Sequence, residues 1–70
     1  MINETILMKR AEFFKDHKIA VHIPKKNNWF NNGLIKEIGE DYLILIDEKE
    51  GEVPIFFSEM FDVLKREEKQ

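Results

Sequence analysis

Two apolar runs separated by a short charged turn place the strongest constraint on this chain. Residues 41–47 read Asp-Tyr-Leu-Ile-Leu-Ile-Asp, residues 53–57 read Val-Pro-Ile-Phe-Phe, and the turn at 48–51 ends in glycine. This order is typical of a β-hairpin. Because every interior residue of 41–47 is apolar, we expect both faces of that strand to be covered, as in a small closed barrel.

The size and composition of the chain limit what it can be. Seventy residues form one domain with a small core, so we expect help from a partner. The absence of cysteine excludes disulfides and thiolate metal sites and fits a reducing compartment. No apolar run is long enough to span a bilayer and the N-terminus lacks the order of a secretory signal, so we expect a cytoplasmic protein without membrane contact.

Charge is distributed unevenly along the chain. The formal net charge is −3, so the net charge of the whole molecule does not indicate affinity for a polyanion. The first half, up to Lys36, is nevertheless net positive, and the second half is acidic. This asymmetry suits a surface that faces nucleic acid, end-to-end complementarity between identical subunits, or ordinary solvated charge.

The N-terminal segment predicts a helix over residues 4–16. Asn3 is a favourable N-cap, Glu4 suits the first turn, and no glycine or proline follows before Asp16. The apolar residues form two adjacent rows at helical spacing, so this side must pack on something. Arg10 falls between the rows, and we expect its guanidinium to reach an acidic or polar partner at the rim.

The remaining residues predict five strands and a charged tail. Residues 18–23 alternate in polarity and form the first strand, which Pro24 ends. Residues 29–38 allow two interpretations: a tight hairpin at Asn32-Gly33, or one long strand bent at Gly33. We prefer the bent strand, because a hairpin would leave residues 29–30 as a stub. After the hairpin described above, a tight turn at 58–61, a short strand at 62–64 and a charged tail at 65–70 complete one domain, with barrel strands over 18–64.

This order of a helix and five strands resembles the Sm-like proteins, within the wider group of SH3-like barrels. The Sm-like pattern apolar-x-Gly-x-apolar is matched by Asn31, Gly33 and Ile35, with Phe30 as the alternative first position, and the aliphatic position that follows is matched by Ile38. The resemblance implies a mainly β fold with one N-terminal helix and a small, five-stranded, bent antiparallel barrel. It also implies self-association, which we expect through the edges of the fourth and fifth strands.

The same comparison gives no support for uridine binding. Gly39 stands where the Sm-like pattern has an aspartate, and Leu43 stands where it has the asparagine that contacts a base. Ser58 and Glu59 follow the fourth strand in place of Arg-Gly. What the resemblance implies for fold and assembly is therefore better supported than what it implies for RNA specificity.

The segment 25–33 supplies the leading functional hypothesis, a non-catalytic module that binds nucleic acid, with single-stranded RNA as the expected partner. Cations track the phosphate backbone, aromatic rings stack on bases and amides read base edges. Alternatively, the rings belong to the core and the asparagines form turns. We expect Phe30 inside and Trp29 at the surface. The predicted binding residues are Lys25, Lys26, Asn28, Trp29, Asn31 and Asn32.

The alternative hypothesis is a protein-interaction adaptor. Its predicted interface consists of Phe56, Phe57 and Phe61, which form an aromatic strand edge for a partner strand or helix.

We expect neither catalysis nor a cofactor. The chain has no cysteine and no serine–histidine pair in a known order. His17 and His22 lack the spacing of a metal site, although His17 can interact with the end of the helix. The acidic residues around Asp47 are expected to form a solvated tip.

Overall fold

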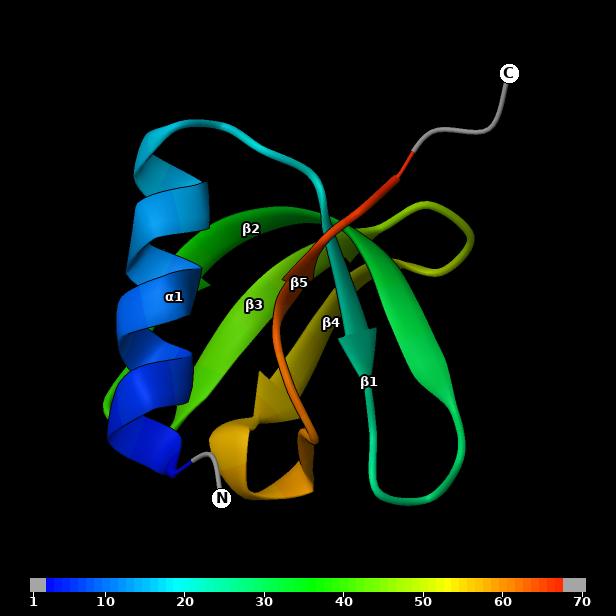
Figure 1. Cartoon of the computed structure of the whole chain (residues 1–70). Coiled ribbons are helices and arrows are strands. Elements are labelled where there is room, and N and C mark those ends of the chain that lie inside the picture. The colour runs from blue at the N-terminus through cyan, green and yellow to red at the C-terminus, as the bar shows by residue number, and fades with distance from the viewer. Residues whose placement is uncertain (1–2, 68–70) are drawn as a thin grey trace.

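The computed structural model describes residues 3–67, which form one helix followed by five strands in a single antiparallel sheet (Figure 1). The predicted class, mainly β with one N-terminal helix and five antiparallel strands, is confirmed. No helix in this part of the chain is long and apolar enough to cross a membrane. The elements are α1 Glu4–Asp16, β1 Val21–Pro24, β2 Phe30–Ile38, β3 Tyr42–Asp47, β4 Gly51–Phe56, the 3₁₀ turn η1 Phe57–Glu59 and β5 Leu64–Lys65.

Helix α1 begins where the sequence predicts. The side chain of Asn3 accepts a hydrogen bond of 3.0 Å from the Ile6 N–H, which satisfies one of the free donors of the first turn. Glu4 adds a negative charge at the positive end of the helix dipole. The predicted bounds, residues 4–16, are confirmed.

The end of α1 has the two hydrogen bonds of a Schellman motif. The Ile19 N–H donates to the Phe14 carbonyl at 2.9 Å, and the Lys18 N–H donates to the Lys15 carbonyl at 3.1 Å. Lys18 takes the left-handed position of this motif, with φ 55°, where glycine is the favoured residue. The predicted interaction of His17 with the helix end is confirmed, since its Nδ1 lies 2.8 Å from the Phe13 carbonyl oxygen.

An ion pair joins the helix to the segment that precedes β5. The Arg10 guanidinium donates to the Asp62 carboxylate, 52 residues later in the chain. The predicted acidic partner of Arg10 is therefore confirmed. Because this contact joins the two ends of the described chain, it helps to hold α1 over the sheet.

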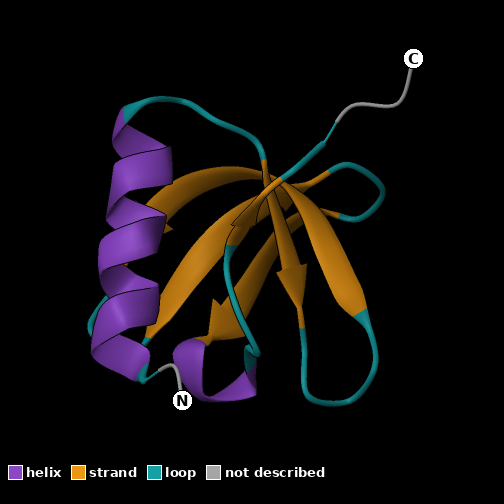
Figure 2. Ribbon diagram, in the orientation of Figure 1, coloured by secondary structure: helices purple, strands orange, loops and turns teal. Residues whose placement is uncertain are grey.

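The sheet has the strand order β4-β3-β2-β1-β5 and curves strongly around the core (Figure 2). Strands β4 and β5 are its two edges and do not pair with each other in the described chain. The sheet is therefore open, and the predicted closed barrel is not confirmed. Where η1 meets the β1–β2 turn, the Lys26 N–H donates to the Glu59 carbonyl at 2.8 Å and an isolated bridge joins Lys25 to Met60.

Strand β2 is one continuous strand that pairs with two neighbouring strands. Its first half pairs with β1 and its second half with β3, and a bulge lies between Ile35 and Glu37. Gly33 lies where the two pairings overlap, and a Cβ at this position would lie 1.9 Å from the Ile46 carbonyl oxygen. Only glycine permits this approach. The bent-strand prediction is confirmed, and the hairpin alternative at Asn32-Gly33 is wrong.

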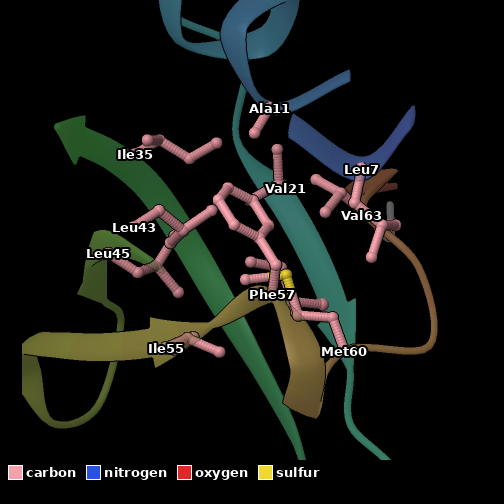
Figure 3. Close-up of a cluster of buried hydrophobic side chains, with 11 residues drawn as sticks. Leu7, Ala11, Val21, Ile35, Leu43, Leu45, Ile55, Phe57, Met60 and Val63 are labelled. Atoms are coloured by element: carbon pink, nitrogen blue, oxygen red, sulfur yellow. The ribbon is translucent and has the colours of Figure 1, made fainter. Parts of the chain in front are cut away.

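The core lies between α1, η1 and the inner face of the sheet. The Phe57 ring lies in the middle of the cluster (Figure 3). The buried hydrophobic residues are Leu7, Ala11, Val21, Ile23, Ile35, Leu43, Leu45, Ile55, Phe57, Met60 and Val63.

Strand β3 differs from the sequence-based expectation on one face. Leu43 and Leu45 are fully buried, whereas Ile46 is 40% exposed and Ile44 is half-buried. The helix covers the inner face alone, so the prediction that both faces of this strand would be covered is wrong for residues 3–67.

Regular structure and side-chain contacts extend further toward the C-terminus than the sequence predicts. Strand β5 includes Lys65, and the Arg66 Nε donates to Glu48 Oε2 at 2.7 Å. The last strand, expected over residues 62–64, thus lies at Leu64–Lys65, one residue into the segment expected as the charged tail. Residues 68–70 of that predicted tail lie outside the described residues.

Candidate interaction surface

The turn between β1 and β2 is built by its asparagines. Asn28 has a left-handed backbone with φ 71°, and its N–H donates to the Lys25 carbonyl at 3.1 Å. The Asn27 side chain accepts a bond of 3.0 Å from the Trp29 N–H. Asparagine tolerates the left-handed region and forms such local bonds better than most residues. Asn27 and Asn28 thus have a structural role here, while the Asn28 side chain stays exposed.

The next two asparagines are engaged within the protein. Asn31 is only 6% exposed, and its Nδ2 donates to Asp47 Oδ2 at 2.8 Å. The Asn32 Oδ1 lies 2.7 Å from His22 Nδ1 across the β1–β2 pair. The prediction that Asn31 and Asn32 contact nucleic acid is therefore not supported, because burial removes Asn31 from solvent and a ring nitrogen holds the Asn32 oxygen.

Asp47 is the centre of a small hydrogen-bond network at the end of β3. Its Oδ1 accepts from the N–H groups of Lys49 at 2.8 Å and Glu50 at 3.0 Å, which shapes the β3–β4 turn. Its Oδ2 accepts from Asn31 and, at 3.3 Å, from the Asn32 N–H. The hydrogen bond from Asn31 and the backbone N–H groups lower the pKa of Asp47.

The expectation of a solvated acidic tip is therefore wrong for Asp47. This role of Asp47 could have been predicted from the neighbouring sequence, because an aspartate at the start of a turn commonly accepts hydrogen bonds from the N–H groups two and three residues ahead.

Trp29 and Phe30 both lie at the surface. Trp29 is 70% exposed, as predicted, but Phe30 is 56% exposed and its ring lies 5.2 Å from the His22 ring. The prediction that Phe30 lies inside is wrong, because residue 30 has the parity of the outward-facing residues of β2.

The two aromatic rings share a hollow with charged groups of both signs. Glu48, Glu50 and Arg66 line this hollow together with Trp29 and Phe30. Lys26, which is predicted to bind nucleic acid together with Trp29, lines a different hollow beside Glu4 and Phe61. The structure therefore does not bring Lys26 and the two rings into one site.

The three phenylalanines of the predicted protein interface occupy different places. Phe57 is 1% exposed and belongs to the core, so its prediction as an interface residue is wrong. The cause is the alternation of β4, which continues for one residue: Ile55 is buried, Phe56 is exposed and Phe57 is buried, and the Phe57 N–H still donates to the Asp41 carbonyl. Phe56 is exposed on the sheet, and Phe61 is exposed beside the β1–β2 turn.

Apolar side chains gather on the side of the sheet that faces away from the core. In the register of the sheet, Leu34 is opposite Ile46, Ile44 is opposite Pro54, and Tyr42 is opposite Phe56. Leu34, Ile46 and Phe56 are 40–47% exposed. The Tyr42 and Phe56 rings meet edge to face, with centroids 6.3 Å apart. We call this set of six residues the outer apolar face: Leu34, Tyr42, Ile44, Ile46, Pro54 and Phe56.

Charged groups border the outer apolar face. Lys36 Nζ donates to Glu52 Oε2 at 2.7 Å, and this hydrogen bond raises the pKa of Lys36. The hydrogen bond from Arg66 lowers the pKa of Glu48. Residues 30–56, which form β2, β3 and β4, contain seven acidic and two basic side chains. The segment that forms this face therefore carries a net negative charge, although Glu52 and Glu48 are paired with Lys36 and Arg66.

Comparison of the sequence with models of known protein families and with curated proteins finds no match. The resemblance to the Sm-like proteins therefore stays a prediction. Leu43, which stands where that pattern has a base-contacting asparagine, is fully buried in the core.

Proposed function

We propose that this protein is a non-catalytic interaction module that binds a protein partner through the outer apolar face. The observation that carries the proposal is the cross-strand pairing of Leu34 with Ile46 and of Tyr42 with Phe56 on a sheet face without a covering layer in residues 3–67. A contiguous apolar patch of this kind, bordered by charged groups, is typical of a protein interface.

The charge around this face defines the chemistry of the partner. Seven acidic and two basic side chains over residues 30–56 attract a partner whose apolar contact surface is bordered by lysine or arginine. The same field repels phosphate groups. A protein with an apolar and basic contact surface therefore fits better than RNA.

The predicted RNA-binding residues give weaker support for nucleic acid. Asn31 and Asn32 are bonded to Asp47 and His22, so two of the four amides of that segment are engaged. The hollow of Trp29 contains the acidic Asp47, Glu48 and Glu50 as well as the basic Lys49 and Arg66, and the predicted residue Lys26 lines a different hollow. Single-stranded nucleic acid requires aromatic rings and cations along one groove.

Selection from a displayed library of random peptides tests this proposal. We expect the selected peptides to combine aliphatic or aromatic residues with lysine or arginine. Their binding should fall at least about tenfold in Leu34→Lys and Ile46→Lys variants, because a buried lysine leaves an unpaired charge at the contact. Ile6→Lys is the matched control, since Ile6 is equally exposed but lies on α1, and it should bind as the wild type does.

A titration with single-stranded RNA at low salt separates the two hypotheses. We expect no measurable binding. RNA binding that weakens steeply with salt and with Lys25→Glu plus Lys26→Glu would contradict the proposal and favour the nucleic-acid module. Selected peptides whose binding is equally insensitive to Ile46→Lys and Ile6→Lys would also contradict it.

A further inference from the structure

The free edge of β4 has a proline at its centre. In the antiparallel pair of β3 and β4, Ile44 lies opposite Pro54. Since proline has no N–H, this pair cannot exchange hydrogen bonds, and the Pro54 nitrogen must face away from β3. The alternation of a strand then sets the backbone groups of Glu52, Pro54 and Phe56 toward the open edge.

The next N–H donor along this edge is hydrogen-bonded to a carboxylate. The Phe56 N–H donates to Glu59 Oε2 at 3.1 Å. Glu59 belongs to η1, which begins directly after β4, so the chain folds its own acceptor back onto the strand edge. Of the three outward-facing positions of β4, Pro54 has no donor and the donor of Phe56 is already bonded. Glu52 remains, and its carboxylate reaches across β3 to Lys36 of β2 and does not cover the open edge.

The other edge of the sheet is short and charged. The Arg66 N–H donates to the Ala20 carbonyl at 2.9 Å, and Val21 lies opposite Lys65. This register directs the backbone of Lys65 away from β1. Strand β5 is only two residues long, and a very short edge strand with an outward lysine is a poor template for pairing.

We infer that Pro54 and Glu59 close the β4 edge to strand addition and thereby keep copies of this chain from pairing edge to edge. Strand addition needs alternating donors and acceptors along the receiving edge, and β4 lacks the two consecutive outward donors at positions 54 and 56. The assembly that the sequence suggested, through the edges of the fourth and fifth strands, therefore lacks a suitable surface. The side chain of Pro54 belongs to the outer apolar face, but this inference does not depend on the proposed function, because it concerns the missing N–H of Pro54 at the edge of the sheet.

Opening the edge by substitution tests the inference. The double variant Pro54→Val with Glu59→Ala gives residue 54 an N–H and frees the N–H of Phe56. Valine also has a strong preference for strands. Light scattering after gel filtration, over a range of concentrations, should show a higher molar mass for this variant than for the wild type. The matched control is Glu12→Ala, which removes one exposed carboxylate from α1 and should leave the mass unchanged. A folded double variant with the same mass as the wild type at every concentration would overturn the inference.

Hydrogen exchange at a single amide gives a second test that needs no double variant. The Phe56 amide should be protected in the wild type although it lies at the strand edge. It should exchange about tenfold faster in Glu59→Ala, and Glu12→Ala should leave it unchanged. Equal exchange rates in the wild type and Glu59→Ala would show that the carboxylate does not occupy this donor, and would overturn the role of Glu59.

Discussion

Asn31 and Asp47 are joined by a hydrogen bond of 2.8 Å from the amide Nδ2 to the carboxylate Oδ2, across 16 positions of sequence. The bond connects the first half of β2 to the end of β3. The same carboxylate shapes the following turn through the N–H groups of Lys49 and Glu50. One ionised side chain thus positions both the start of the bent strand and the β3–β4 hairpin.

Replacement of Asp47 by alanine should destabilise the protein by about 1–3 kcal/mol, because it leaves the buried Asn31 amide without its acceptor and frees the turn. Urea unfolding followed by circular dichroism measures the loss. Glu50→Ala is the control, since Glu50 is exposed on the same turn, and should change the free energy of unfolding by less than about 0.5 kcal/mol.

The contribution of Asp47 should also depend on pH. Its pKa is lower in the folded protein than its ordinary value of about 4. The stabilisation is therefore present above about pH 4 and is lost as the pH falls through the lowered pKa. The difference in unfolding free energy between the wild type and Asp47→Ala should shrink in acid. An unchanged difference between pH 7 and strong acid would contradict this role of the carboxylate.

Lys18→Gly should stabilise the protein by up to about 1 kcal/mol, because the left-handed backbone at this position strains a residue with a Cβ. Part of the gain is offset by the greater chain entropy of glycine. Thermal unfolding is the measurement. Lys15→Gly, inside α1, is the matched control and should destabilise by about 1 kcal/mol. An equal loss in the two variants would show that the Schellman motif is not strained by Lys18.

Gly33→Ala should be severely destabilising, by about 3 kcal/mol or more, because its Cβ would meet the Ile46 carbonyl oxygen and neither backbone can move without disturbing the ladder. Gly51→Ala is the control. Gly51 has φ 80° with open space around it, so its variant should lose only about 1 kcal/mol. Denaturant unfolding of the two variants measures the difference, and a tolerated Gly33→Ala would contradict the close approach of β2 and β3.

Neighbouring residues of β3 should respond differently to the same substitution. Leu45→Thr removes a fully buried side chain and should cost about 3–5 kcal/mol. Ile46→Thr, on the outer apolar face, should cost less than about 1 kcal/mol because threonine keeps the β-branch and the site is exposed. Chemical denaturation of both variants compares them. A large loss at Ile46 would show that its side chain is packed inside the protein and would remove it from the outer apolar face.

Several local features could be predicted because short stretches of sequence determine them. Asn3 caps a helix whose 13 residues contain no glycine or proline, so the bounds of α1 follow from neighbouring residues. Gly33 marks the bend of β2 because a residue without Cβ permits the close approach of another backbone. The apolar position of Arg10 on the helix indicated that its charge needed a partner.

The side on which each aromatic ring lies could not be predicted in the same way. Alternation requires that consecutive strand residues face opposite sides, but it does not say which side is the core. Phe30 was expected inside and lies outside. Phe57 is expected at an interface and lies in the core, because it has the same parity as the buried Ile55.

The sequence by itself determined the helix, the approximate positions of the strands and the bend at Gly33, since caps, alternation and glycine act over a few residues. Only the tertiary structure decided which face α1 covers, and hence that Leu34, Ile46 and Phe56 remain exposed. It also decided the partners of Asn31, Asn32 and Asp47. Those contacts join residues distant in the chain, and their geometry depends on how the curved sheet places β1, β2 and β3 beside one another.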